Sequence, residues 1–260
     1  MDSRLRGNDR LYIQTRKSQI CNFMNQIHDI LNFWFEGITD ETPIDKNGNP
    51  FKKWFAKDTK FDAEIHARFA DDLVRAQNGH YRSWDKTSDG RLALVILFDQ
   101  FSRNLHRGTP KMFENDPYAL NLSLRSIKEG MDKQLFLIYR IFLYMPLMHS
   151  EEREDQEISL KYFAGLINES KQKKSSNASY YEYTLGYAKQ HHAIIERFGR
   201  FPHRNAILGR VSTPEEVVFL TGAKATGLPV DLAAVLARGF MPRASGDPKG
   251  RPLTQPGSAF

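Results

Sequence analysis

Apolar side chains recur along this chain at the three- and four-residue spacing of amphipathic helices. In the segment at residues 25–35, Ile27, Ile30, Leu31 and Trp34 fall on one helical face. Alternation typical of β-strands does not extend over a useful length anywhere in the chain. The regular structure that we expect is therefore helical.

A second amphipathic helix is predicted from Thr59, as its N-terminal cap, to Gly79, which ends it. Two later segments, at residues 92–101 and 135–144, are apolar nearly all round and are typical of buried helices. For the first of them a buried strand is the competing interpretation, although no partner strand is visible. Pro146 is expected to end the second.

Four more helices have recognisable beginnings and ends. Thr213 and Glu216 form the spacing of a capping box, with Pro214 between them and Gly222 as the expected end. The other three are expected to start at Asn115 or Asp116, at Ser150, and at Asn177 or Ser179, with ends at Gly130 and Gly199 for the first and last. About eight helices with short connections predict an all-α fold, a stack of antiparallel helical hairpins.

The net charge of +6 does not indicate a nucleic-acid partner, because the excess basic residues lie near the two ends of the chain. Residues 1–24 and residues 223–260 each carry five basic and two acidic side chains, which leaves residues 25–222 neutral. A protein that binds a phosphate backbone needs a basic footprint on its folded domain. We expect no nucleic-acid partner.

The same counts suggest three parts: a basic tail at residues 1–24, one helical domain at residues 25–222, and an extension at residues 223–260 that is mostly disordered. The stretch at residues 2–9 resembles translated dispersed repeat DNA, and Met24 is the expected functional start. No apolar run reaches the roughly 20 residues that a bilayer requires, and we expect no membrane partner. The lone Cys21 fits a reducing cytoplasm.

Polar residues at the end of the first buried helix form one candidate site. Asp99 and Arg103 are four residues apart, as are Gln100 and Asn104, so each pair shares a face. Two interpretations are equally consistent with these residues. They form an internal salt bridge with helix-end hydrogen bonds, or they form the wall of a polar pocket.

Histidines supply the candidates for proton transfer. His149 precedes a helix N-terminus, where Ser150 and Glu151 have an ordinary explanation as cap and as partner of the helix dipole. His192 can contact Glu196 one turn later. His149, His192 or His191, Glu196 and His203 could bind zinc only if the fold brought them together. Since the spacing lacks a zinc-binding pattern, we assign no metal ligand and leave open whether a metal is bound.

The stretch from Arg197 to Asn205 is unusually rich in cations for a loop. Arg200, His203 and Arg204 alternate there with two phenylalanines. Arginine offers a rigid fork for carboxylate or phosphate, so an anion-binding loop is one interpretation. The other is that Arg200 and Arg204 cap helix ends and pair with acids of the core.

Four motifs carry a resemblance to a known family. DQFSRN at residues 99–104, FLYMPLMHSE at 142–151, RFGRFPHRN at 197–205 and LGRVSTPEE at 208–216 resemble a bacterial family known as domain of unknown function 924. The resemblance covers roughly residues 26–222 and implies a tetratricopeptide-like all-α fold, without implying a reaction. Ser102 stands where we expect the family to favour proline.

The hypothesis that follows is a cytoplasmic protein with a pocket for a small anionic molecule. Acid–base candidates are His149, His192 and His203, and ligand-binding candidates are Asp99, Gln100, Arg103, Asn104, Glu151, Arg200, Arg204 and Asn205. The alternative is a helical-repeat module for protein–protein interaction, without catalysis. Cofactor, reaction class and self-association are left open.

Overall fold

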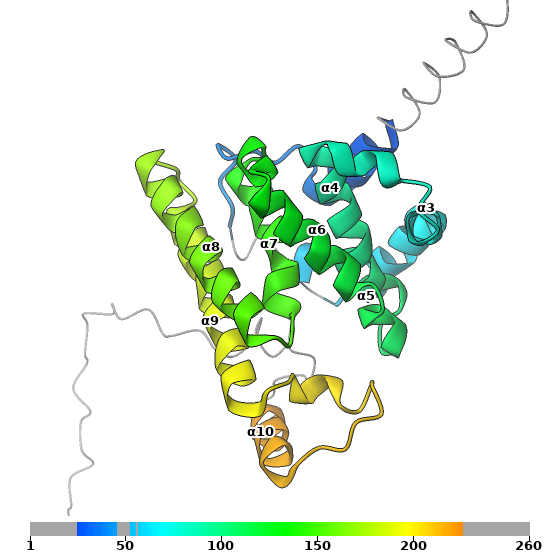
Figure 1. Ribbon diagram of the computed structural model, residues 1–260, viewed down its shortest axis with the longest axis vertical. Helices are drawn as coiled ribbons and strands as arrows, with labels where there is room; N and C mark the ends of the chain where they lie inside the picture. The colour runs from blue at the N-terminus through cyan, green and yellow to red at the C-terminus, as the bar shows by residue number, and fades with distance from the viewer. Residues whose placement is uncertain (1–24, 46–52, 56, 226–260) are drawn as a thin grey trace, which may run out of the picture.

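The computed structural model describes residues 25–45, 53–55 and 57–225, with side chains up to Thr221. These residues form helices and connecting turns and contain no strand, which confirms the all-α prediction. The predicted tails lie almost wholly outside the described residues. A helix at residues 25–35 is followed by the elements labelled in Figure 1: α3 (Thr59–Gln77), α4 (Ser88–Val95), α5 (Ser102–Leu105), α6 (Asp116–Lys128), α7 (Leu137–His149), α8 (Arg153–Gln172), α9 (Ala178–Phe198) and α10 (Pro214–Ala225).

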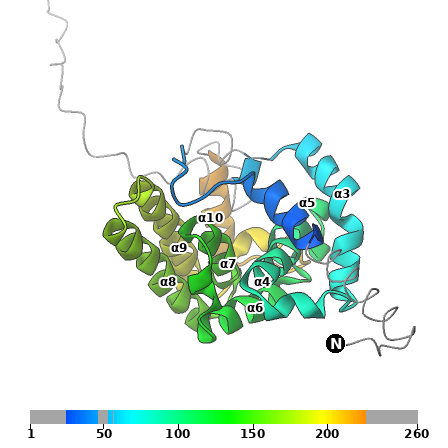
Figure 2. The ribbon, with the colours of Figure 1, turned by 90° about the horizontal axis from the view of Figure 1, so that it is seen from above.

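The longest helices, α8 and α9, lie side by side and antiparallel in both ribbon views (Figures 1 and 2). α7 packs against both of them, and α6 packs against α7 and α4. Beyond the end of α9, α10 packs on a short 3-10 helix, η5 (Pro202–Arg204). This arrangement is compatible with tetratricopeptide-like stacking of helical hairpins.

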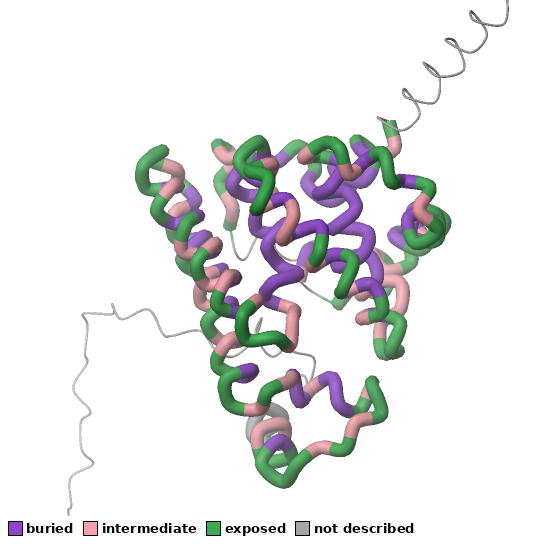
Figure 3. The backbone as a smooth tube through the Cα atoms, in the orientation of Figure 1, coloured by how far each residue is buried: buried purple, intermediate pink, exposed green. Residues whose placement is uncertain are grey.

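The core is concentrated in α4 and α7, which are buried along nearly their whole lengths (Figure 3). Trp34 of the first helix packs edge-on against Phe101 and Phe142, with ring centroids 5.6 Å away in each case. The indole Nε1 of Trp54 donates to the carbonyl of Trp34 at 2.8 Å. Such aromatic pairs stabilise a core beyond the area that they bury.

Two predicted helix starts are wrong by a few residues. Asp58, and not Thr59, caps α3, because its carboxylate accepts from the backbone N–H groups of Lys60 and Phe61. Ser150 lies in an extended conformation, and α8 begins only at Arg153. In both places a polar side chain still satisfies backbone donors that the helix start leaves free.

Two predicted helix ends are also wrong. α7 continues through Pro146 to His149. Proline removes the backbone donor that would bond the carbonyl four residues back, and the next carbonyl, of Leu143, accepts from the hydroxyl of Ser123 in α6 at 2.6 Å. α10 passes Gly222 and extends to Ala225, because glycine inside a helix costs only about 1 kcal/mol relative to alanine.

The predicted helix at residues 92–101 changes geometry midway. α4 begins earlier, at Ser88, and after Val95 the chain continues as a π-helical segment, η2 (Ile96–Phe101). The N–H of Ser102 bonds to the carbonyl of Leu97, five residues back, and the Ser102 hydroxyl donates to the same carbonyl at 3.2 Å. Such wide turns are frequent at functional sites, and Asp99 lies inside this one.

Candidate functional site

The centre of the candidate site is a contact between Asp99 in η2 and His149 at the end of α7. The Asp99 side chain is fully buried, and its Oδ1 lies 2.7 Å from Nδ1 of His149. Burial alone would raise the pKa of Asp99, but Arg103 and His149 outweigh it and hold that pKa well below its usual range. An ionised carboxylate only accepts, so Nδ1 of His149 carries a hydrogen and donates it to Asp99, and Nε2 is the nitrogen that is left to exchange a proton.

Arg103 holds this carboxylate from the next helical turn. Its Nη1 lies 3.1 Å from Asp99 Oδ1 and donates to the Asp99 carbonyl at 2.7 Å. Its Nη1 and Nη2 also donate to the two carboxylate oxygens of Asp116, at 2.9 and 3.1 Å. The sequence left an internal salt bridge between Asp99 and Arg103 open, and the structure contains it.

Arg204 approaches the same cluster from η5. Its Nη2 donates to the carbonyl of His149 at 2.9 Å, and its Nη1 lies 3.6 Å from Asp116. Its guanidinium lies over the rings of Phe113 and Phe201, 4.6 Å from each centroid. Burial lowers the pKa of Arg204 to about 10, so the side chain stays cationic at neutral pH. His149 is thus positioned through its ring by Asp99 and through its backbone by Arg204.

Two further histidines lie beside His149. The His191 ring centroid is 6.1 Å from that of His149, and its Nδ1 lies 2.9 Å from the carbonyl of Tyr187, to which it donates. Burial, followed by His149, lowers the pKa of His191 to about 3. Burial, followed by Arg204, holds the pKa of His203 well below its usual range. Both rings are therefore neutral at pH 7.

Several buried nitrogens at this cluster have no hydrogen-bond partner within the described part of the chain. They are Nδ1 of His203 and the Nε atoms of Arg204 and Arg210. More than nine in ten buried polar groups in proteins are satisfied, so such a concentration requires an explanation.

The other predicted residues hold neighbouring segments together. Gln100 donates to Asp99. Asn104 donates to Asp62 at 2.8 Å. Glu151 accepts from the backbone N–H of Phe201 and pairs with Arg210 at 2.7 Å. Arg200 and Asn205 both bind Glu216 at the start of α10.

His192 does not join the cluster, although the prediction placed it in the site. It is half-buried, and Glu196, its expected partner, pairs with Arg153 at 2.8 Å instead. The buried positions of α9 include Thr184, Ala188, His191 and Ile195. That three- and four-residue spacing is the signal in the sequence that selects His191 over its neighbour.

Asp116 and Phe113 also belong to the cluster, and no pattern in the sequence singles out either of them for it. Asp116 was expected only as a helix start.

In the described residues, no three histidine, cysteine or acidic side chains are placed to hold a metal ion. None of the described helices is both long and apolar enough to cross a bilayer.

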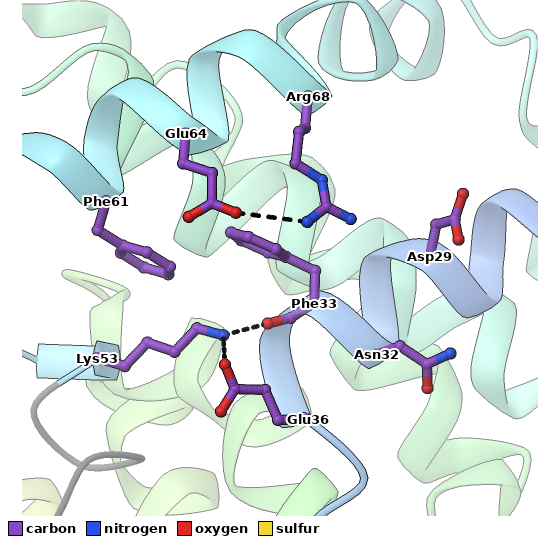
Figure 4. A pocket seen from close by; sticks show the side chains of 8 residues that line it. All are labelled: Asp29, Asn32, Phe33, Glu36, Lys53, Phe61, Glu64 and Arg68. Carbon is purple, nitrogen blue, oxygen red and sulfur yellow. Dashed lines mark hydrogen bonds and ion pairs between the residues drawn. The ribbon is translucent and has the colours of Figure 1, made fainter.

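A groove of about 440 Å³ lies away from this cluster, between the first helix and α3 (Figure 4). Phe33 and Phe61 stack there with centroids 5.4 Å apart. Lys53 pairs with Glu36 at 2.6 Å, and Arg68 lies 3.5 Å from Glu64. The groove shares no residue with the histidine cluster, and both of its cations are already held by carboxylates that line it.

Comparison with known proteins agrees with the resemblance in the motifs. The chain belongs to the family described as bacterial protein of unknown function (DUF924), whose model matches residues 30–224. A solved protein of unknown function from Agrobacterium tumefaciens is 34% identical, with a TM-score of 0.62 over 76% of this chain and 98% of that one. No curated protein matches the chain. Every residue of the histidine cluster lies within the matched range.

Proposed function

We propose that the cluster around His149 binds a small anionic molecule and exchanges a proton with it. The observation that carries the proposal is the 2.7 Å contact between Asp99 and His149. A buried carboxylate that holds one imidazole nitrogen orients the ring and leaves the other nitrogen for proton transfer. In the described structure, Nε2 of His149 has no hydrogen-bond partner, and the side chain is 17% exposed.

An anion is the ligand that the local charges favour. The charged neighbours that shift the pKa of His191 are His149, Arg204 and Arg103, and all of them lower it. Those acting on His203 include Arg204 and Arg210, with the same sign. Burial is the largest cause of both shifts, and the arginines that act in the same direction would attract a negative group. The unsatisfied N–H groups of Arg204 and Arg210 are suitable donors to carboxylate or phosphate.

The roles follow from the contacts. His149 transfers the proton, Asp99 orients it, and Arg103 positions Asp99. Arg204 and His203 contact the ligand, and Glu151 holds Arg210 in place. Asn104, Arg200 and Asn205 stabilise the surrounding helix ends through their bonds to acidic side chains and do not contact the ligand. A cytoplasmic location remains part of the proposal.

Thermal unfolding of the full chain with inorganic phosphate or citrate tests this function. A ligand present at 100 times its Kd should add about 2.7 kcal/mol to the free energy of unfolding. The variant His203→Leu should lose that gain, because it removes a nitrogen that has no partner within the described structure. The matched variant His192→Leu, outside the cluster, should keep it.

Protection by neither anion, or equal protection of both variants, would contradict the proposal. The alternative of a helical-repeat interaction module would then be favoured, since stacked helical hairpins bind partners without needing an acid–base site.

A further inference from the structure

A second groove, of about 610 Å³, lies where the end of α3 meets α6, and it shares no residue with the histidine cluster. It is also lined by a 3-10 helix, η1 (Arg82–Lys86), and by the buried side chains of Leu94, Phe98 and Leu122. Tyr118 stands over Phe98, with ring centroids 5.7 Å apart, and is 61% exposed. An aromatic side chain left this exposed beside an apolar floor can contact a ligand without rearrangement of the core.

The charges around this groove are unbalanced. Asp85 lines it, but its carboxylate is already bound by Arg91 and Arg125, at 2.8 Å each. Arg82 lines it too and is exposed, and no ion pair to its guanidinium is found in the described part of the chain. Among the described residues, the groove therefore offers one cation without an ion pair.

Gly79 leaves space for that cation beside the groove. A Cβ at this position would lie 2.7 Å from Nε of Arg82, and the backbone has a positive φ of 75°. The absence of a side chain at Gly79 lets the guanidinium lie across the backbone at the end of α3. The turn that carries Arg82 thus depends on this glycine because of its positive φ.

We infer that this groove binds an amphipathic organic carboxylate, with its apolar body on Leu94, Phe98 and Leu122 and its carboxylate on Arg82. The volume lies within the roughly 300–1,000 Å³ range of small-molecule sites, which combine an apolar lining with a few polar anchors. Arginine matches a carboxylate with two parallel hydrogen bonds. Charge complementarity selects a single negative group, because the described residues give the groove one cation without an ion pair.

Isothermal titration calorimetry of the full chain with decanoate, octanoate and uncharged decanol tests the inference. Decanoate should bind more tightly than octanoate by about tenfold, because each buried methylene contributes about 0.8 kcal/mol. Decanoate should also bind more tightly than decanol.

Three variants locate the ligand. Arg82→Gln should weaken decanoate binding by about twofold to fivefold, the usual worth of an exposed ion pair, and leave decanol binding unchanged. Lys86→Gln removes a positive charge from the same 3-10 helix outside the groove and should change neither affinity. Tyr118→Ser should weaken both ligands.

The inference is overturned if decanoate does not bind, or if Arg82→Gln and Lys86→Gln bind it equally well. Because Arg82 and Tyr118 are exposed, neither substitution threatens folding. His149→Gln should bind decanoate like the unmodified chain. That result separates this groove from the histidine cluster.

Discussion

Asp99 and His149, fifty residues apart, meet in the core through a carboxylate–imidazole contact of 2.7 Å. The substitution Asp99→Asn keeps the shape but leaves Arg103 and His149 without their buried negative partner. Breaking a buried ion pair from one side costs about 3–5 kcal/mol. We expect a loss near the lower figure, because Arg103 keeps Asp116. Urea unfolding of both proteins at pH 7 measures the loss.

The same variant has an expected pH dependence. The folded pKa of Asp99 lies below the value of about 3.9 for an unfolded aspartate. Its contribution is therefore fully present above about pH 4 and is lost as the pH falls toward the folded pKa. The difference in stability between the two proteins should still be present at pH 5 and should shrink below pH 4. A constant difference down to pH 2 would contradict the assignment.

His191 should make the fold sensitive to mild acid. Its folded pKa of about 3 lies below the unfolded value of about 6.5, so its stabilisation is complete above pH 6.5 and is lost on acidification. At pH 5 this lowers the free energy of unfolding by about 2 kcal/mol. Between pH 7 and pH 5, the free energy of unfolding should fall in both proteins. In His191→Gln the fall should be smaller than in the unmodified chain by about 2 kcal/mol, as measured by urea unfolding.

The neighbouring histidine is the control for this prediction. His192→Gln should keep the full pH dependence, because His192 lies outside the buried stripe of α9. Identical behaviour of the two variants would show that His191 does not carry the effect.

Gly90 is required by a close backbone approach. A Cβ there would lie 2.2 Å from the carbonyl oxygen of Trp84 and 2.8 Å from Oγ1 of Thr87, which caps α4. The backbone must shift to admit it, so Gly90→Ala should lower the free energy of unfolding by more than 1 kcal/mol. Gly165→Ala, inside α8 with open space around it, should raise it by about 0.5–1 kcal/mol. The same sign for both would refute this account.

Glu216 attaches α10 to the rest of the domain. The hydrogen bond from Arg200, followed by other contacts, lowers the pKa of Glu216 to about 2. The variant Glu216→Gln should speed amide hydrogen exchange in α10 and leave α9 unchanged. Glu215→Gln, which removes only the exposed pair with Arg197, should have no such effect. Equal exchange in both variants would mean that α10 is held by other contacts.

The sequence predicts local features of this fold well. The capping box at Thr213 and Glu216 is confirmed by reciprocal hydrogen bonds of 3.2 and 2.7 Å. Gly199 ends α9 with a positive φ of 66°, as its residue type indicates. In each case the interactions that determine the structure join residues a few positions apart, so the local sequence is enough to predict them.

Features that depend on distant partners could not be predicted in this way. The helix passes Pro146, and a carbonyl next to the one that loses its donor accepts from Ser123 on another helix. The π-helical turn that contains Asp99 has no signature in residue spacing. Asp116 became part of the cluster only through Arg103 and Arg204. The prediction found most of the cluster because its residues carry polar chemistry at otherwise apolar helix ends.

Nuclear magnetic resonance of the full chain labelled with ¹⁵N-histidine tests the central claim most directly. At a pH where the ring of His149 is neutral, its Nδ1 should be protonated and its Nε2 unprotonated. Adding inorganic phosphate should move the resonances of His149 and His203 saturably and leave those of His192 in place. An Nε2-protonated His149, or phosphate shifts that include His192 to the same extent, would contradict the account.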